Sequence, residues 1–384
     1  MKPSRFASLL GLALAGALLS PAGALASHRH GSAVEGHVYV DDNNSGENTI
    51  AAFDRHADGT LTPLPGSPFP AGGEGTGGGL ASQGALQLSA DGRYLLAVDA
   101  GSSQISVLQI KHDGRLRLLN GSPVSSGGEK PVTIAVHGPL VYVGNAGASD
   151  SNYTGFVLSP GGQLRPLSGS TFPLPAGAQP GDVEFNSTGA NLVGARIGES
   201  KIDSFSVSGA GLLTPAAGSP FEAQGAGPFG SEFRPTNPSQ LFVSNAHGGP
   251  GKGTVSAFSV ATDGTLSSIN GSPFADEQTA PCWVEITRDG SFLFTVNTAD
   301  GSVSRYQIEA DGALKLLGST TLKGGETLGS VDARLSPDGA TLFVVDSKAA
   351  ALSALAVSGG GLSELGSSPT LLPKGATPAG IVVD

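Results

Sequence analysis

Acidic side chains gather at one position of a segment that recurs along the chain. In successive copies, that position holds Gln87, Ala135, Glu184, Glu232, Glu285, Arg334 and Val382. The position two residues earlier holds Ala85, Thr133, Asp182, Gly230, Trp283, Asp332 and Gly380. Residues two apart on a strand share one face. We therefore expect these carboxylates to meet near Arg334 and Trp283.

This cluster permits three interpretations. Neighbouring carboxylates separate one another's pKa values, so a pair can supply a general acid and a base. Glu184 or Glu232 would be the base, and Arg334 would hold an anion. The expected ligand contacts are Asp182, Trp283, Glu285 and Asp332. Carboxylates also bind hard cations, which makes Ca²⁺ the candidate cofactor, although no residue is assigned as a metal ligand. In the third interpretation they line a water-filled channel, solvated or paired with Arg334.

Two further side chains carry chemistry. Arg196 stands where the other six copies have Asp or Asn, at the end of a second strand. An inward guanidinium can bind a substrate carboxylate or phosphate, whereas a salt bridge within its own copy would be structural. His247 lies in the loop from Ala246 to Gly253. It is a candidate base or ligand contact, because imidazole titrates near neutral pH.

The element that must position these residues is marked by a Gly-Ser tag. The tag occurs at Gly66-Ser67-Pro68-Phe69, Gly121-Ser122-Pro123-Val124, Gly169-Ser170-Thr171-Phe172, Gly218-Ser219-Pro220-Phe221 and Gly271-Ser272-Pro273-Phe274, with weaker copies from Gly318 and Gly366. The tags are 47 to 55 residues apart, a period that fits a four-stranded propeller blade. The sequence therefore predicts an all-β, seven-bladed propeller of antiparallel blades.

Each copy contains four strand signals separated by turns. In the fifth copy these are residues 230–234, 241–245 and 254–260, then a strand beginning at Leu266 after the turn Asp263-Gly264. The first copy, from His37, lacks its first strand, whereas residues 379–384 form a first strand with nothing after it. We therefore expect one domain over 37–384, closed by the C-terminal strand completing blade one, which removes two open sheet edges.

The repeat resembles the lactonase-type propellers, which include 6-phosphogluconolactonases and carboxymuconate lactonising enzymes with Tyr-Val-Thr-Asn-type repeats. The resemblance is carried by Ser336-Pro337-Asp338-Gly339, by Leu342-Phe343-Val344-Val345-Asp346 and by Val255-Ser256-Ala257-Phe258. It implies the propeller fold and a lactone-hydrolysing or cycloisomerising activity.

The resemblance also implies a place for the catalytic groups. That family has Gly-Pro-Arg-His in one blade and Asn-Glu at the end of the next strand. The matching positions here hold Gly227-Pro228-Phe229-Gly230 and Asn245-Ala246. Phe229, Gly230 and Ala246 cannot transfer a proton through their side chains. Two functions stay open: a propeller that binds a small carboxylate, lactone or extracytoplasmic protein, and a lactone hydrolase or cycloisomerase with a rearranged site.

The first residues predict export. Lys2 and Arg5 precede an apolar run from Phe6 to Leu19, and a cleavage site follows at Ala26/Ser27, as in a signal peptide. We expect residues 1–26 to be removed, 27–36 to be flexible, and the product to be a secreted or periplasmic monomer without a membrane span.

Composition excludes some partners and adds minor candidates. Loss of Lys2 and Arg5 takes the net charge from −11 to −13, which disfavours nucleic acid. Cys282 is the only cysteine and is expected to be a small buried apolar residue. Residues 41–46 resemble the start of a calcium loop, but Ala52 occupies the twelfth position. The glycine-rich segment 72–79 is expected to be a flexible loop.

Overall fold

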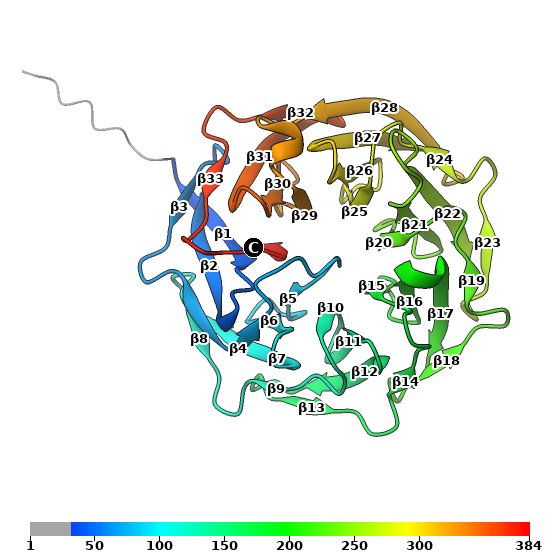
Figure 1. Ribbon diagram of the computed structural model, residues 1–384, viewed down its shortest axis with the longest axis horizontal. Coiled ribbons are helices and arrows are strands. Elements are labelled where there is room, and N and C mark those ends of the chain that lie inside the picture. The colour runs from blue at the N-terminus through cyan, green and yellow to red at the C-terminus, as the bar shows by residue number, and fades with distance from the viewer. Residues whose placement is uncertain (1–31) are drawn as a thin grey trace, which may run out of the picture. The chain divides into compact units, whose positions relative to one another are not determined.

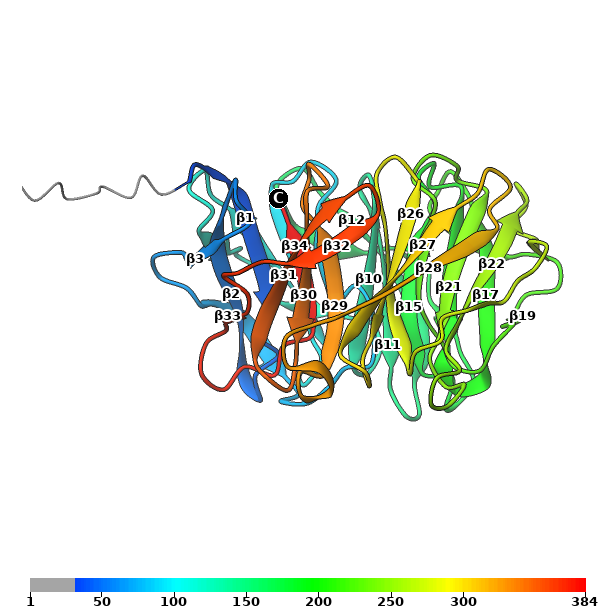
Figure 2. The same cartoon turned by 90° about the horizontal axis from the view of Figure 1, so that it is seen from above.

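The computed structural model describes residues 32–384, which form a ring of seven β-sheets around a central axis (Figure 1). The predicted signal peptide and residues 27–31 lie outside the described residues. The first strand begins at Val34, three residues before the expected start of the domain. Seen from above, the blades stand side by side with their strands steeply inclined (Figure 2).

The strands of each blade run from the axis outward. Blade 1 contains β34 (Gly380–Val383), β1 (Val34–Asp41), β2 (Gly46–His56), β3 (Leu61–Pro63) and β4 (Phe69–Gly75). Blade 2 contains β5 (Leu86–Leu88), β6 (Tyr94–Asp99), β7 (Gln104–Ile110), β8 (Leu116–Leu118) and β9 (Val124–Ser125). Blade 3 contains β10 (Pro131–His137), β11 (Leu140–Ala146), β12 (Ser151–Leu158), β13 (Leu164–Pro166) and β14 (Phe172–Pro173).

The remaining four blades repeat this plan. Blade 4 contains β15 (Pro180–Phe185), β16 (Asn191–Arg196), β17 (Lys201–Val207), β18 (Leu213–Pro215) and β19 (Phe221–Glu222). Blade 5 contains β20 (Pro228–Phe233), β21 (Gln240–Asn245), β22 (Thr254–Val260), β23 (Leu266–Ser268) and β24 (Phe274–Ala275). Blade 6 contains β25 (Pro281–Ile286), β26 (Phe292–Asn297), β27 (Ser302–Ile308) and β28 (Leu314–Thr321). Blade 7 contains β29 (Ser330–Leu335), β30 (Thr341–Asp346), β31 (Ala351–Ser358), β32 (Gly361–Glu364) and β33 (Thr370–Leu371). Two 3₁₀ turns are η1 (Ile197–Glu199) and η2 (Gly325–Thr327).

The Gly-Ser tag recurs because its serine hydroxyl accepts a backbone hydrogen bond. In blade 2, the Ser122 hydroxyl accepts a bond from the backbone N–H of Val107 at 2.7 Å. In blade 5, the Ser272 hydroxyl does the same for Ala257 at 2.7 Å. Equivalent bonds reach Ser67, Ser170, Ser219 and Ser368. The serine thus satisfies a third-strand donor where the outer strand turns away, as buried backbone groups require. Blade 6 has the continuous strand β28 there instead.

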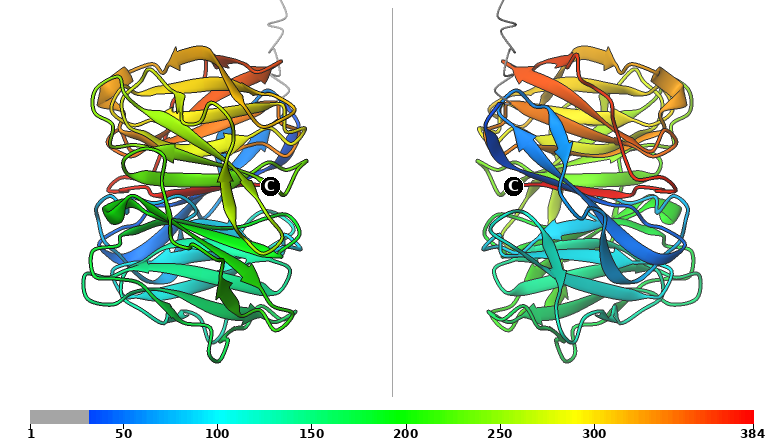
Figure 3. Two further views of the ribbon diagram at one scale, coloured as in Figure 1. Left: turned by 90° about the vertical axis from the view of Figure 1, so that its right-hand side faces the viewer. Right: turned by 90° about the vertical axis from the view of Figure 1, so that its left-hand side faces the viewer.

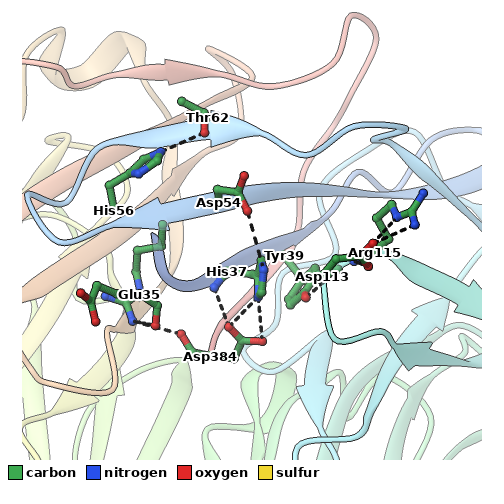
Figure 4. Close-up of polar contacts among 11 residues, drawn as sticks. Glu35, His37, Tyr39, Asp54, His56, Thr62, Asp113, Arg115 and Asp384 are labelled. Atoms are coloured by element: carbon green, nitrogen blue, oxygen red, sulfur yellow. Dashed lines mark hydrogen bonds and ion pairs between the residues drawn. The ribbon is translucent and has the colours of Figure 1, made fainter. Parts of the chain in front are cut away.

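Ring closure is as predicted. β34 pairs antiparallel with β1, with Ile381 opposite Val40 and Val383 opposite Val38. Figure 3 shows the red C-terminal strand beside the blue β1. At the end of this pair the Asp384 carboxylate accepts bonds from the backbone N–H of His37 at 2.5 Å and from its ring Nδ1 at 3.1 Å (Figure 4). The two ends of the propeller are therefore joined by both backbone and side-chain bonds.

The core lies between adjacent blades. Apolar clusters join each blade to the next, and the largest fully buried side chains include Tyr39, Tyr142, Tyr153 and Tyr306. The Tyr39 and Tyr142 hydroxyls donate to the carbonyls of Gly114 and Gly211, which lie in hairpin turns of the following blade. Buried tyrosines need such partners. Among residues 32–384, no helix is long and apolar enough to span a membrane.

Candidate functional site

The centre of the ring is crossed by the segment 76–84, which joins β4 to β5 and which we call the axial loop. Figure 1 shows it reaching inward from the blue side of the ring. The Asn43 side chain bonds Thr76 and Gly78 at its start. The Ser82 hydroxyl donates to the Val132 carbonyl at 2.7 Å. The expectation of a flexible glycine-rich loop is therefore wrong, because residues 72–75 belong to β4 and the axial loop is anchored at both ends.

Gln83 ties the axial loop to three further blades. Its backbone N–H donates to the Gly181 carbonyl at 2.9 Å. Its side-chain amide donates to the Ser231 carbonyl at 3.0 Å and accepts from the N–H of Val284 at 2.9 Å. Beside it, the Trp283 indole N–H donates to the Ser82 carbonyl at 2.8 Å. The loop therefore closes the axis with groups that are hydrogen-bonded on several sides.

The predicted carboxylates meet farther along the same innermost strands. We call Asp182, Glu184, Glu232, Glu285 and Asp332 the carboxylate ring. Arg334 pairs with Glu285 at 3.1 Å, and the other Glu285 oxygen accepts from the N–H of Leu335 at 2.8 Å. Asp182 accepts from both the N–H and the hydroxyl of Ser231, at 2.8 and 2.7 Å. Glu285 and Asp182 thus link neighbouring blades, as a structural role requires.

Other oxygens of the carboxylate ring are still available for hydrogen bonding. Glu184 and Glu232 are partly buried, and Glu232 Oε2 and Asp332 Oδ2 are buried without a hydrogen-bond partner among the residues that the structure describes. Burial raises the pKa of Glu184 to about 8, of Asp182 to about 7 and of Asp332 to about 6. It also raises the pKa of Glu232 well above its usual value. With a pKa of about 8, Glu184 is mostly protonated at pH 7, so it suits proton transfer better than cation binding.

These raised pKa values predict a pH dependence of stability. A carboxyl whose folded pKa exceeds its unfolded pKa stabilises the fold below the unfolded value, and this contribution is lost as pH rises through the folded value. We expect the free energy of unfolding to fall between pH 5 and pH 9. At about 1.4 kcal/mol per pKa unit, and discounting for partial exposure, Glu184 accounts for roughly 2–4 kcal/mol of this fall. His37, whose pKa is raised by its bond to Asp384, acts in the same direction.

Urea denaturation across this pH range would measure the effect. Glu184→Gln should flatten the profile, because an amide keeps the shape but does not titrate. The exposed Glu309→Gln is the matched control and should leave the slope unchanged. Stability that rises toward pH 9, or an unaltered slope in Glu184→Gln, would contradict the assignment.

Arg196 does not join the carboxylate ring. Arg196 is 5% exposed, and its guanidinium bonds both oxygens of Asp203, at 2.6 and 2.5 Å, and Glu199 at 3.2 Å. Asp203 lies on the neighbouring strand β17. In other blades the second-strand residue accepts a cross-strand hydrogen bond from a serine hydroxyl, as Asp99 does from Ser106 and Asp346 does from Ser353. Asp203 and Glu199 therefore hold Arg196 in a salt bridge within its own blade, and the prediction that it faces a ligand with Glu184 and Glu232 is corrected.

Two cavities open beside the axial loop. The first, which we call the axial pocket, has a volume of about 270 Å³ and is lined by Leu80, Phe229, Cys282 and Trp283, among others. The second has a volume of about 230 Å³ and is lined by the same loop together with Lys130 and His247. The exposed His247 therefore lines the second cavity, beside the axial loop. Trp283 lies in the axial pocket, toward the start of its strand.

Metal and thiol chemistry gain no support. In the described part of the chain, no group of three His, Cys, Asp or Glu side chains is placed to hold a metal ion. The calcium-like segment instead anchors the axial loop through Asn43. Cys282 is buried, as expected, and burial raises the pKa of its thiol to about 12. The thiol therefore stays protonated at neutral pH and is a poor nucleophile.

Residues 232–382 match the family model described as lactonase, seven-bladed β-propeller. The chain is a seven-bladed propeller, and this part of it is similar to the lactonase family. No curated protein matches its sequence.

Solved structures of the same shape agree with this fold. A candidate 6-phosphogluconolactonase of Bacteroides uniformis is 19% identical, with a TM-score of 0.73, over 92% of this chain and 100% of that one. One of Bacteroides fragilis is also 19% identical, with a TM-score of 0.70, over 91% and 98% of the two chains. The periplasmic gluconolactonase PpgL of Pseudomonas aeruginosa is 18% identical, with a TM-score of 0.68, over 91% and 98%. At this identity the likeness concerns the fold alone.

In this propeller, the positions that the resemblance assigns to catalytic groups hold other residues. Phe229 is buried and stacks on Trp283 with ring centroids 4.9 Å apart. A Cβ on Gly230 would lie 2.1 Å from Gln83 Oε1 and 2.8 Å from the Cys282 carbonyl oxygen. Ala246 is buried in the same apolar cluster. Gln83 therefore fills the space that a side chain at position 230 would need.

Sequence reasoning missed Gln83 and the axial loop. The one available signal was length: the step from the first tag to the second is 55 residues, the longest of the set. The extra length indicates that residues are inserted in this copy, but it does not indicate that they cross the centre of the ring.

Proposed function

We propose that this propeller is an extracytoplasmic binding protein, which holds a small ligand at its axial face without hydrolysing lactones. The observation that carries the proposal is the pairing of Gly230 with Gln83. The position expected to supply a histidine has no side chain, and the amide that replaces it has both of its polar atoms bonded to other blades. An amide whose polar atoms are both hydrogen-bonded in this way neither transfers protons nor attacks a substrate.

Two further observations support binding over hydrolysis. Arg196 is engaged by Asp203 and does not gather with Glu184 and Glu232 around one pocket. The axial pocket itself is lined mainly by apolar groups, which is typical of a ligand site with few orienting polar contacts. The extracytoplasmic setting rests on the signal-peptide pattern of the first 26 residues.

A lactone panel tests the proposal. Residues 27–384 would be purified, shown to be folded by circular dichroism, and given glucono-δ-lactone, 6-phosphogluconolactone and muconolactone while acid release is followed. We expect no rate above spontaneous hydrolysis, with or without Ca²⁺. A catalysed rate in folded protein would overturn the binding assignment.

The carboxylate ring supports one alternative, a hydrolase or cycloisomerase acting from within the channel. The raised pKa values of Glu184 and Glu232 beside Arg334 favour it, because they provide a protonated acid near a cation. If turnover were found, Glu184→Gln, Glu232→Gln and Arg334→Met should abolish it, with Glu309→Gln as the control. Turnover that survived all three would place the chemistry outside the ring.

A further inference from the structure

The side chain of His37 lies where the C-terminal strand closes the ring, between two carboxylates (Figure 4). Its ring Nδ1 is 3.1 Å from the Asp384 carboxylate, which follows β34 directly. Its ring Nε2 is 3.7 Å from the Asp54 carboxylate on β2, which is within the range of an ion pair. The imidazole of His37, on β1, therefore stands between side chains of the two strands that flank β1 in the sheet.

This arrangement distinguishes the two protonation states of the imidazole. A neutral imidazole has one N–H donor and one nitrogen that only accepts. Whichever nitrogen carries the hydrogen, the other turns its lone pair toward a carboxylate of Asp54 or Asp384. An imidazolium carries an N–H on both nitrogens together with a positive charge, so it attracts both carboxylates. The geometry therefore favours the protonated ring, and the hydrogen bond to Asp384 raises the pKa of His37 accordingly.

The neighbouring blade holds the imidazole in this position. The side chain of His37 is 15% exposed, and its ring packs on the backbone of Gly114, in the turn between β7 and β8, so closely that a Cβ there would overlap the ring. The Tyr39 hydroxyl donates to the carbonyl of the same glycine at 2.8 Å. A rotation of the imidazole toward solvent would therefore cost a packing contact with blade 2.

The other charged groups nearby have partners of their own. Asp113 pairs with Arg115 at 2.7 Å, and the Arg55 guanidinium bonds the backbone carbonyls of Glu35 and Asp384. The titratable and charged groups around His37 are Glu35 and Tyr39 on β1, Asp54 and Arg55 on β2, Asp384 after β34, and His112, Asp113 and Arg115 in the turn of blade 2. Among residues 32–384, the carboxylates within ion-pair distance of the ring are those of Asp54 and Asp384.

We propose that His37 is a proton-dependent clasp on the closure of the ring. In its protonated form it links Asp384, and with it β34, to Asp54 on β2. Loss of the proton removes the charge that attracts both carboxylates, so β34 separates from β1 more often. This device acts on ring closure and is independent of the ligand that the axial face holds.

The direction of the pH dependence follows from the raised pKa of His37. Stabilisation of this kind is complete below the pKa of an unfolded histidine, about 6.5, and is lost as the pH rises through the higher folded value. Local opening of β34 should therefore become more frequent between pH 6 and pH 9. The carboxylate ring lowers the stability of the whole propeller over the same range, so a measurement confined to β34 is needed.

Hydrogen exchange followed by mass spectrometry on residues 27–384 measures this opening. The protection of a peptide that covers β34 would be compared at pH 6 and pH 9, after correction for the intrinsic exchange rate. The third strand of blade 5, β22, is the internal reference, because unfolding of the whole ring exposes both strands equally. We expect the protection of β34 relative to β22 to fall at least about threefold over this range.

Three variants assign the effect to His37. His37→Gln keeps a polar side chain that does not titrate, so the relative protection should change less than about 1.5-fold. Asp54→Asn removes the carboxylate beside Nε2, so it should reduce the pH dependence and lower the pKa of His37 in an NMR titration of the ring. His137→Gln is the matched control. That ring packs on Gly189 as His37 packs on Gly114, but among residues 32–384 it has no carboxylate within ion-pair distance, so the variant should keep the pH dependence of the parent.

Two results would overturn the clasp. One is relative protection of β34 that is the same at pH 6 and pH 9, and the other is an equal fall in the parent and in His37→Gln. If His37→Gln does not fold, Asp54→Asn decides, since an unaltered pH dependence and an unaltered pKa of His37 in that variant would also overturn the proposal.

Discussion

Removal of residues 380–384 is expected to leave a chain that no longer forms a stable ring. The deletion takes away β34, whose backbone pairs with β1 at four positions from Val38 to Asp41. It also removes the buried side chains of Ile381 and Val383 from their cluster with Phe343. Opening the ring exposes the edge of β1 and uncovers the adjoining blades. Since domains are stable by only about 5–15 kcal/mol, this loss should prevent folding or produce aggregation, visible by gel filtration and circular dichroism.

A single substitution in β34 tests the same prediction by a measurable loss of stability. Ile381→Ala should lower the free energy of unfolding by about 2–5 kcal/mol, as deletion of a buried aliphatic side chain does. The matched control is Leu371→Ala, on an outer strand and 73% exposed, which should change stability by less than about 0.5 kcal/mol. A shortened chain whose melting temperature stays within two degrees of the parent would show that blade 1 is stable without β34.

The fold was predictable because each blade repeats the same local requirements. The tag serine recurs because the third strand of six blades has a backbone donor to satisfy where the outer strand leaves it, as Ser122 does for Val107. The period of the tags then counts the blades, and the missing first strand before His37 indicates the closure. Strand limits followed from the alternation of apolar and polar residues, so β22 spans 254–260, as expected.

The carboxylate ring was predictable for the same reason, since equivalent positions of repeated strands must converge on the axis. The salt bridge of Arg196 was not predictable in this way, because it depends on the register between β16 and β17, which sets the position of its partner Asp203. The axial loop was also beyond pattern analysis. It has no repeat and no periodicity, and Gln83 gains its role from bonds to residues 98 to 201 positions away in the chain.

Placing a side chain at position 230 is expected to be strongly destabilising, and it should not create a lactonase. In Gly230→Ala the new Cβ would stand 2.1 Å from Gln83 Oε1 and 2.8 Å from the backbone oxygen of Cys282. Relief requires Gln83 to abandon its bonds to Ser231 and Val284, which leaves a buried carbonyl and N–H unsatisfied at about 1–3 kcal/mol each. We expect a loss of roughly 2–5 kcal/mol, and a larger loss for Gly230→His.

A double-mutant cycle isolates the contact. Gln83→Gly should destabilise the ring on its own, but Gly230→Ala added to it should cost at least 1 kcal/mol less than in the parent, because the side-chain clash is gone while the Cys282 contact remains. Gly209→Ala is the control, since a Cβ there meets nothing within 4 Å in residues 32–384. Additive losses would show that Gln83 can move aside freely. The axial loop would then be a movable cover over position 230 rather than a fixed replacement for the side chain expected there, and the case against hydrolysis would have to rest on Phe229 and Ala246 alone.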